Sequence, residues 1–149
     1  MSIAIFSGMV LLVVTVVIHA LGTTHWARFL IRRYARRSGA FKEREALRVV
    51  TGTALVLLLL HVVEIVVWAL AYMLLLPSGE LQTVEKAVYF SLVTFTTVGY
   101  GDVALTAVDW RLLSGIEALN GMLLLGWSTA LLYAIVHRTL AGYEGGAAR

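Results

Sequence analysis

The sequence predicts an all-α membrane protein, because the chain is too apolar for a soluble domain and its apolar residues gather in three long runs. Hydrophobic residues make up 60% of the 149 residues, whereas a typical soluble domain has about 45–50%. There is no cysteine, which excludes disulfides and thiolate metal sites. Basic residues crowd beside the apolar runs, so the net charge of +3 indicates a membrane surface and no nucleic-acid partner.

Each apolar run is long enough to form a transmembrane helix. The runs cover Ile3 to Gly22, Thr51 to Leu76 and Leu112 to Val136, and a helix needs about 20 residues to cross the hydrocarbon core. The first run lacks a basic segment before it and is longer than the apolar part of a signal peptide, so we expect a retained helix. The predicted segments are an extra N-terminal helix in 1–24, an outer helix at 51–76, an inner helix at 111–137 and a short cytoplasmic tail at 139–149.

A basic segment, residues 25–50, separates the first two runs. Short loops this basic stay in the cytoplasm, so the N terminus is predicted outside and the C terminus inside. The arginine spacing is also typical of a helix face on anionic lipid, and the sequence leaves open whether the segment binds lipid or only fixes the topology. The basic residues of this segment are Arg28, Arg32, Arg33, Arg36, Arg37, Lys42, Arg44 and Arg48.

The segment between the second and third runs does not resemble an ordinary loop. Residues 83–95 are predicted to form a helix of about three turns, with Thr83 as N-cap, which is too short to span the bilayer. The stretch "TTVGYGD", Thr96 to Asp102, then contains two glycines and no helical pattern. Irregular backbone at membrane depth is tolerated only where protein shields it or where it lines a watery path. We therefore predict a re-entrant helix followed by a strand that climbs back out.

The residues of this stretch suit a cation that has lost its water. Rings of backbone carbonyls can replace the hydration shell of a potassium ion if successive carbonyls point toward one axis. Gly99 and Gly101 adopt the necessary backbone angles without Cβ strain. Thr97 can add a ring of hydroxyls, while Val98 and Tyr100 are expected to point their side chains away from the axis.

"TTVGYGD" resembles the signature filter of potassium channels, and residues 55–136 resemble the two-helix, one-pore-loop channel module. The resemblance implies a pore module at 51–138 with a filter at 96–102, supported by Thr96, Gly101 and Asp102. It also implies a homotetramer, since one loop forms a quarter of a ring, and transport without catalysis, so the protein is not an enzyme. The residues implied to bind permeant K⁺ through their carbonyls are Thr97, Val98, Gly99 and Tyr100.

One position departs from the family pattern, and the role of two glycines is not decided by the sequence. Some bacterial relatives have a pore-helix glutamate that pairs with the filter aspartate, but Val93 stands there, and we expect Tyr89 to bond Asp102 instead. Gly121 aligns with a hinge glycine of the family and is followed by a second small residue, Gly126. Close helix packing is the alternative for both glycines, and for Gly121 the sequence does not decide between hinge and packing.

Polar residues inside the predicted spans need partners or functions, because ionisable groups are costly in a membrane. One interpretation is a hydrogen-bonded cluster that pairs the helices. Another is a pH sensor, because histidine titrates near physiological pH and a neighbouring carboxylate changes its titration. The residues concerned are His19, His61, Glu64, Glu117 and Asn120.

The sequence therefore predicts a potassium-selective channel subunit in a plasma membrane, and the small size suggests a bacterial inner membrane. The first alternative is a non-conducting or regulatory subunit of a larger assembly. A potassium-uptake transporter subunit is a second alternative, although such chains usually repeat the pore unit four times. A zinc or haem protein that uses His19, His61 and Glu64 is a remote third.

Overall fold

The computed structural model describes residues 2–34, 43–76 and 81–147, with side chains described as far as Thr139. The described residues form four α-helices, one short 3₁₀ helix and no strand. The helices are α1 (Ser2–Tyr34), α2 (Glu43–Leu75), α3 (Val84–Phe95), the 3₁₀ helix η1 (Val108–Trp110) and α4 (Arg111–Ala147). The predicted all-α fold class is therefore confirmed.

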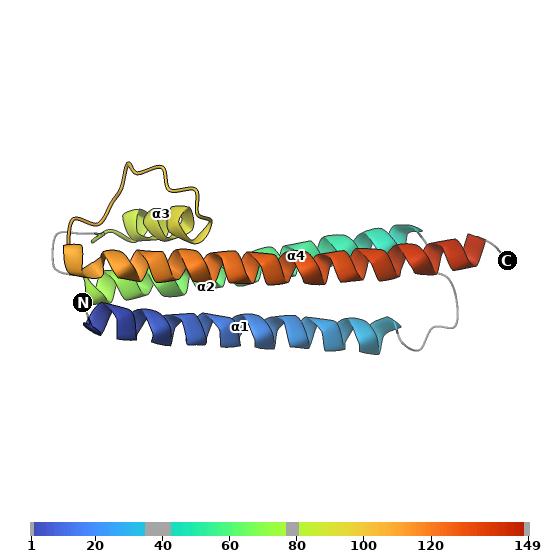
Figure 1. Ribbon diagram of the computed structural model, residues 1–149. Helices are drawn as coiled ribbons and strands as arrows, with labels where there is room; N and C mark the ends of the chain where they lie inside the picture. The colour runs from blue at the N-terminus through green and yellow to red at the C-terminus, as the bar shows by residue number, and fades with distance from the viewer. Residues whose placement is uncertain (1, 35–42, 77–80, 148–149) are drawn as a thin grey trace.

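Within the described part of the chain, three segments are long and apolar enough to cross a membrane, namely Ser2–Tyr34, Arg44–Leu75 and Val108–Thr139. The helices α1, α2 and α4 run side by side and contact one another, as Figure 1 shows. The short helix α3 packs against α2 and α4 at the end of the bundle opposite the C terminus. The N terminus lies at the same end as α3.

The long helices extend beyond their apolar runs, so the predicted boundaries are too narrow. Helix α1 continues to Tyr34 and α2 already begins at Glu43, which places most of the predicted linker 25–50 in helix. The helical hydrogen bonds continue because arginine and lysine are good helix formers. The Trp26 Nε1 atom donates to Thr53 Oγ1 at 3.0 Å and joins the two helices there. Arg36, Arg37 and Lys42 lie outside the described residues.

The predicted start of α4 agrees with the structure, whereas its predicted end does not. Helix α4 begins at residue 111 as predicted, but it continues to Ala147 instead of ending at 137. The tail predicted at 139–149 is therefore helical as far as the structure describes it. Apolarity marks the part of a helix that faces lipid, whereas the helix itself continues into water when its residues have adequate helix propensity.

Helix α3 has the boundaries that the sequence predicts. Thr83 is its N-cap, and the hydroxyl of Thr83 accepts a hydrogen bond from the Lys86 amide at 3.3 Å. The helix buries Ala87, Phe90 and Phe95 in the main apolar core, which α2 and α4 also build. The other members of this core are Ile65, Trp68, Ala69, Tyr72, Leu76, Leu81, Leu105, Leu113 and Leu124.

Candidate functional site

The irregular stretch after α3 is bonded to the end of that helix in a Schellman motif. The Val98 amide donates to the Val93 carbonyl at 3.0 Å, and the Thr97 amide donates to the Thr94 carbonyl at 2.9 Å. These are the two hydrogen bonds that define the motif, and they place Thr97 at the position usually held by glycine. The Gly99 amide also reaches the Val93 carbonyl, at 3.3 Å. The C-terminal carbonyls of α3 thus fix the first residues of the stretch.

Positive φ angles occur at every second residue of this stretch. Thr97 has φ 60°, Gly99 has φ 57° and Gly101 has φ 79°. Val98 and Tyr100, which lie between them, are not among the described residues with positive φ. When residues in the left-handed conformation alternate with residues in other conformations, successive peptide groups turn toward one side of the chain, as in backbone nests. A β-branched residue with positive φ is a strained outlier, and such outliers gather at functional sites.

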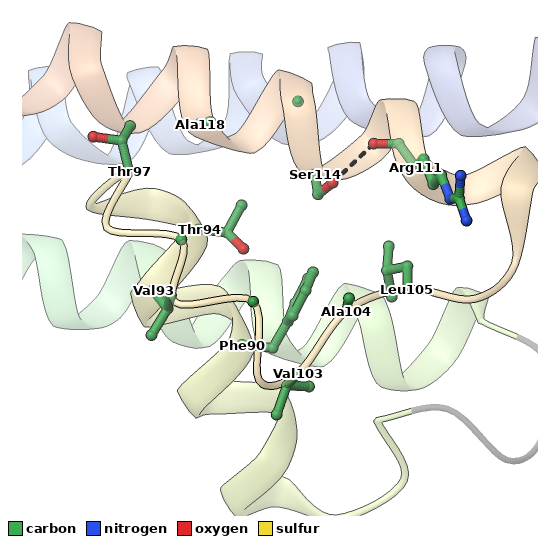
Figure 2. Close-up of a pocket in the computed structure, with 13 residues that line it drawn as sticks. Phe90, Val93, Thr94, Thr97, Val103, Ala104, Leu105, Arg111, Ser114 and Ala118 are labelled. Atoms are coloured by element: carbon green, nitrogen blue, oxygen red, sulfur yellow. Dashed lines mark hydrogen bonds between the residues drawn. The ribbon is translucent and has the colours of Figure 1, made fainter.

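An open pocket of ≈ 570 Å³ lies between this stretch and the N-terminal part of α4. Figure 2 shows Phe90 and Thr94 on the α3 side and Ser114 and Ala118 on the α4 side. The Ser114 hydroxyl donates to the Arg111 carbonyl at 2.8 Å, so it is satisfied within its own helix. The pocket is lined by Phe90, Val93, Thr94, Thr97, Gly99, Gly101, Val103, Ala104, Leu105, Arg111, Ser114, Gly115 and Ala118.

The end of the stretch is fixed by the hydrogen bond that the sequence analysis expected. The Tyr89 hydroxyl donates to Asp102 Oδ2 at 2.7 Å. This hydrogen bond lowers the pKa of Asp102 below its ordinary value, because it stabilises the ionised carboxylate. Val93 occupies the position of the missing glutamate and contributes only its backbone carbonyl, to Val98 and Gly99.

The two glycines of α4 have different surroundings. A Cβ on Gly121 would overlap with the backbone carbonyl of Phe95, the last residue of α3. Gly121 is buried, and because it has no side chain, α3 can approach α4 closely at this point. A Cβ on Gly126 would meet nothing within 4 Å. The structure therefore shows close packing of α3 against Gly121 and open space where a Cβ on Gly126 would lie.

Glu117 joins three helices behind the irregular stretch. Its Oε2 accepts from the Tyr72 hydroxyl at 2.6 Å, and its Oε1 accepts from the Ser91 hydroxyl at 2.5 Å. The Ser91 hydroxyl also lies 3.0 Å from the Ile65 carbonyl. Tyr72, Ser91 and Glu117 are fully buried. Since Tyr72 is on α2, Ser91 on α3 and Glu117 on α4, this network fixes the short helix α3 against the two long helices.

Four side chains from α1, α2 and α4 form a second polar cluster, which we call the histidine cluster. Glu64 Oε1 lies 2.8 Å from His19 Nδ1, and Glu64 Oε2 lies 2.9 Å from His61 Nδ1. On the other side, Ser128 Oγ lies 2.9 Å from His61 Nε2 and 3.3 Å from His19 Nε2. All four residues are buried. His19, His61 and Glu64 also offer possible metal-ligating atoms within 4.8 Å of one another.

Asn120 forms a separate contact with α1. Its Nδ2 donates to Thr15 Oγ1 at 2.7 Å, while its buried Oδ1 has no partner among the described residues. The structure thus brings His19, His61 and Glu64 together and places Glu117 and Asn120 in two other networks. Sequence reasoning missed the partners Thr15, Tyr72, Ser91 and Ser128. Hydroxyl side chains are too common in apolar helices for their identity alone to indicate such a pairing.

Comparison with protein families gives one match, to a family described as "Ion channel", and it covers residues 58–138. The matched segment contains most of α2, all of α3, the irregular stretch and α4 as far as Arg138. It excludes α1. No significant match was found among curated proteins or among solved structures.

Proposed function

Because the chain belongs to the ion channel family, we propose that it is the subunit of a potassium-selective channel and that four copies surround one conduction path. The chain is a multi-pass membrane protein by its family and its three long apolar helices. In the proposal, K⁺ moves down its gradient and no covalent bond is made or broken. The selectivity filter is the stretch from Thr96 to Asp102.

The observation that carries this proposal is the backbone of the filter. Positive φ at Thr97, Gly99 and Gly101 supports a chain whose carbonyls turn the same way. Carbonyl oxygens that face one axis replace the hydration shell of K⁺. In the proposal, the carbonyls of Thr97, Val98, Gly99 and Tyr100 bind the ion, and the Thr97 hydroxyl adds a further oxygen.

The exposure of the filter in a single chain supports assembly around an axis. Tyr100 is 73% exposed and Val98 is 52% exposed, and both lie beside backbone that needs hydrogen-bond partners or water. Lipid would leave that backbone unsatisfied, so the stretch must face protein or a watery path. One chain cannot enclose a path, and fourfold assembly encloses it while covering both side chains. The pocket in Figure 2 is then open to a neighbouring subunit.

The proposed orientation follows from the basic ends of α1 and α2. Arg28, Arg32 and Arg33 lie near the end of α1, and Arg44 and Arg48 lie near the start of α2. Positive residues beside short connections remain in the cytoplasm, so the filter lies on the outer side of a plasma membrane. In this orientation the same arginines meet the anionic lipid of the inner leaflet.

The test is ion flux through purified protein in liposomes. Potassium flux that barium blocks, with little sodium leak, is the expected result. Gly99→Ala is expected to abolish the flux because alanine is strained at φ 57°. Gly52→Ala is the matched control, since its Cβ would meet only ordinary contacts with Trp26 at 3.5 Å. Equal sodium and potassium flux would contradict the selectivity, and silence of the intact protein would favour a regulatory subunit.

A further inference from the structure

The histidine cluster has four close polar contacts, and each of them needs one hydrogen atom. The contacts join Glu64 to both Nδ1 atoms and Ser128 to both Nε2 atoms of His19 and His61. An ionised carboxylate supplies no hydrogen, a neutral imidazole supplies one, and a serine hydroxyl supplies one. Ionised Glu64, two neutral histidines and Ser128 therefore supply three hydrogens for four contacts.

We propose that the histidine cluster is a proton-binding site that holds one proton more than ionised Glu64 and two neutral histidines. With this proton on an imidazole, one Nε2 donates to Ser128, and Ser128 donates to the other Nε2. With the proton on Glu64, the carboxyl donates to one Nδ1, and that histidine donates to Ser128 through its Nε2. Both arrangements satisfy all four contacts.

The extra proton also cancels the charge of the cluster. Without it the cluster carries the negative charge of Glu64 at a position that is fully buried between three helices. With it the cluster is neutral, either as a carboxylate beside an imidazolium or as a carboxylic acid beside two imidazoles. A buried charge without a partner is far more costly than a satisfied neutral network. Charge and hydrogen-bond count thus require the same proton.

No other described ionisable group competes for this proton. The other rings beside the histidines are Trp127, whose centroid is 5.5 Å from that of His19, and Phe95, at 5.8 Å from His61. Glu117 lies on the same helix as Ser128 but about 16 Å further along it, and it bonds to Tyr72 and Ser91 instead. The extra proton is therefore shared only among the groups of the cluster.

The histidine cluster lies between α1 and Phe95, the residue that precedes the proposed filter. His61 packs on the ring of Phe95, which is the last residue of α3 and directly precedes the filter. His19 stacks on His61 with ring centroids 5.3 Å apart. Loss of the proton leaves a charged cluster between α1 and these rings. The proton therefore holds α1 in place and keeps the packing at the base of the filter.

The test is the pH dependence of the unfolding equilibrium, measured by detergent titration in mixed micelles. In the unfolded protein the separated histidines are neutral above their ordinary titration range and do not hold the extra proton. Unfolding of the intact protein is therefore favoured up to tenfold per pH unit as the pH rises above about 7. Glu64→Gln is the decisive variant. A glutamine amide donates to one Nδ1 and accepts from the other, which satisfies all four contacts without the extra proton. Its unfolding constant is expected to lack this dependence.

The matched control is Thr15→Val, which removes the α1 to α4 hydrogen bond between Thr15 and Asn120 and leaves the cluster intact. This variant is expected to unfold more easily at every pH, with the same slope as the intact protein. A flat profile for the intact protein, or an unchanged slope in Glu64→Gln, would overturn the proposal. Stabilisation by added Zn²⁺ that depends on His19 would assign the site to a metal instead. Because ion flux is not the readout, the result is independent of the proposed conduction.

Discussion

The backbone carbonyl of Phe95 packs against Gly121, so that the last residue of α3 contacts the main chain of α4. No side chain fits between them. The proposed filter begins at the next residue, and its first amides donate to the carbonyls of Leu92, Val93 and Thr94. The position of the filter base therefore depends on the absence of a Cβ at residue 121.

Gly121→Ala is expected to displace the end of α3 and to disturb the filter. Overpacking of a tight contact costs about 1–3 kcal/mol, and here the obstacle is backbone that cannot change rotamer. We expect a lower melting temperature together with a loss of potassium over sodium selectivity in liposome flux. Gly126→Ala is the control, since its Cβ would have open space within the subunit. A Gly121→Ala channel with normal selectivity and altered opening would support a hinge instead.

Tyr89→Phe is expected to raise the pKa of Asp102 toward its ordinary value. The Tyr89 hydrogen bond lowers this pKa, so it stabilises the filter above the ordinary aspartate pKa, and the stabilisation is lost as the pH falls through the lowered value. In the variant the carboxylate takes up its proton at a higher pH. The measurement is a carbon NMR titration of Asp102 from about pH 2 to about pH 6. Tyr133→Phe, remote on α4, should leave the titration unchanged.

Thr97→Gly is expected to keep or raise the stability of the protein and to lower its potassium conduction. Thr97 occupies the left-handed position of a Schellman motif, which costs a non-glycine residue about 1–2 kcal/mol. Glycine relieves this strain but removes the hydroxyl that we propose as a potassium ligand. We expect unfolding measurements to show equal or higher stability, offset in part by the greater freedom of glycine in the unfolded chain. Potassium flux should fall, and unchanged flux would show that the hydroxyl does not bind the ion.

Glu117→Ala is expected to destabilise the subunit, whereas Glu117→Gln is expected to resemble the intact protein. Alanine leaves the buried hydroxyls of Tyr72 and Ser91 without this acceptor, at about 1–3 kcal/mol for each group left unsatisfied. Glutamine retains an oxygen for Tyr72 and offers an amide to Ser91. Melting temperatures in lipid nanodiscs provide the comparison. Equal stability of the alanine variant would mean that the Glu117 network does not hold α3 in place.

The sequence was sufficient to predict the helices, because these depend on residues that are close together along the chain. Apolar length located α1, α2 and α4, and the N-cap Thr83 with a span too short to cross located α3. The Tyr89–Asp102 hydrogen bond was also predicted, but from the resemblance to potassium channels and not from the residues alone. The ends of α1 and α4 are predicted too early and the start of α2 too late, since apolarity reports contact with lipid and not the limits of helical hydrogen bonding.

The polar partners across helices were not accessible from one sequence. A spacing of three residues puts His61 and Glu64 on one face of α2, but it does not show which turn of α1 or α4 meets that face. Ser128 and Thr15 are ordinary residues for a membrane helix, and only packing shows that they complete two buried networks. The function of Gly121 likewise required the position of the Phe95 carbonyl.

The contact between His19 and Ser128 has a consequence for biosynthesis, because the two residues are 109 positions apart. Synthesis at about 5–20 residues per second separates their emergence from the ribosome by about 5–20 s. The nascent first helix carries its histidine and Thr15 through that interval before their α4 partners exist. Its retention in the bilayer thus depends first on its own apolar surface. The polar contacts between α1 and α4 therefore form only after α4 has been synthesised.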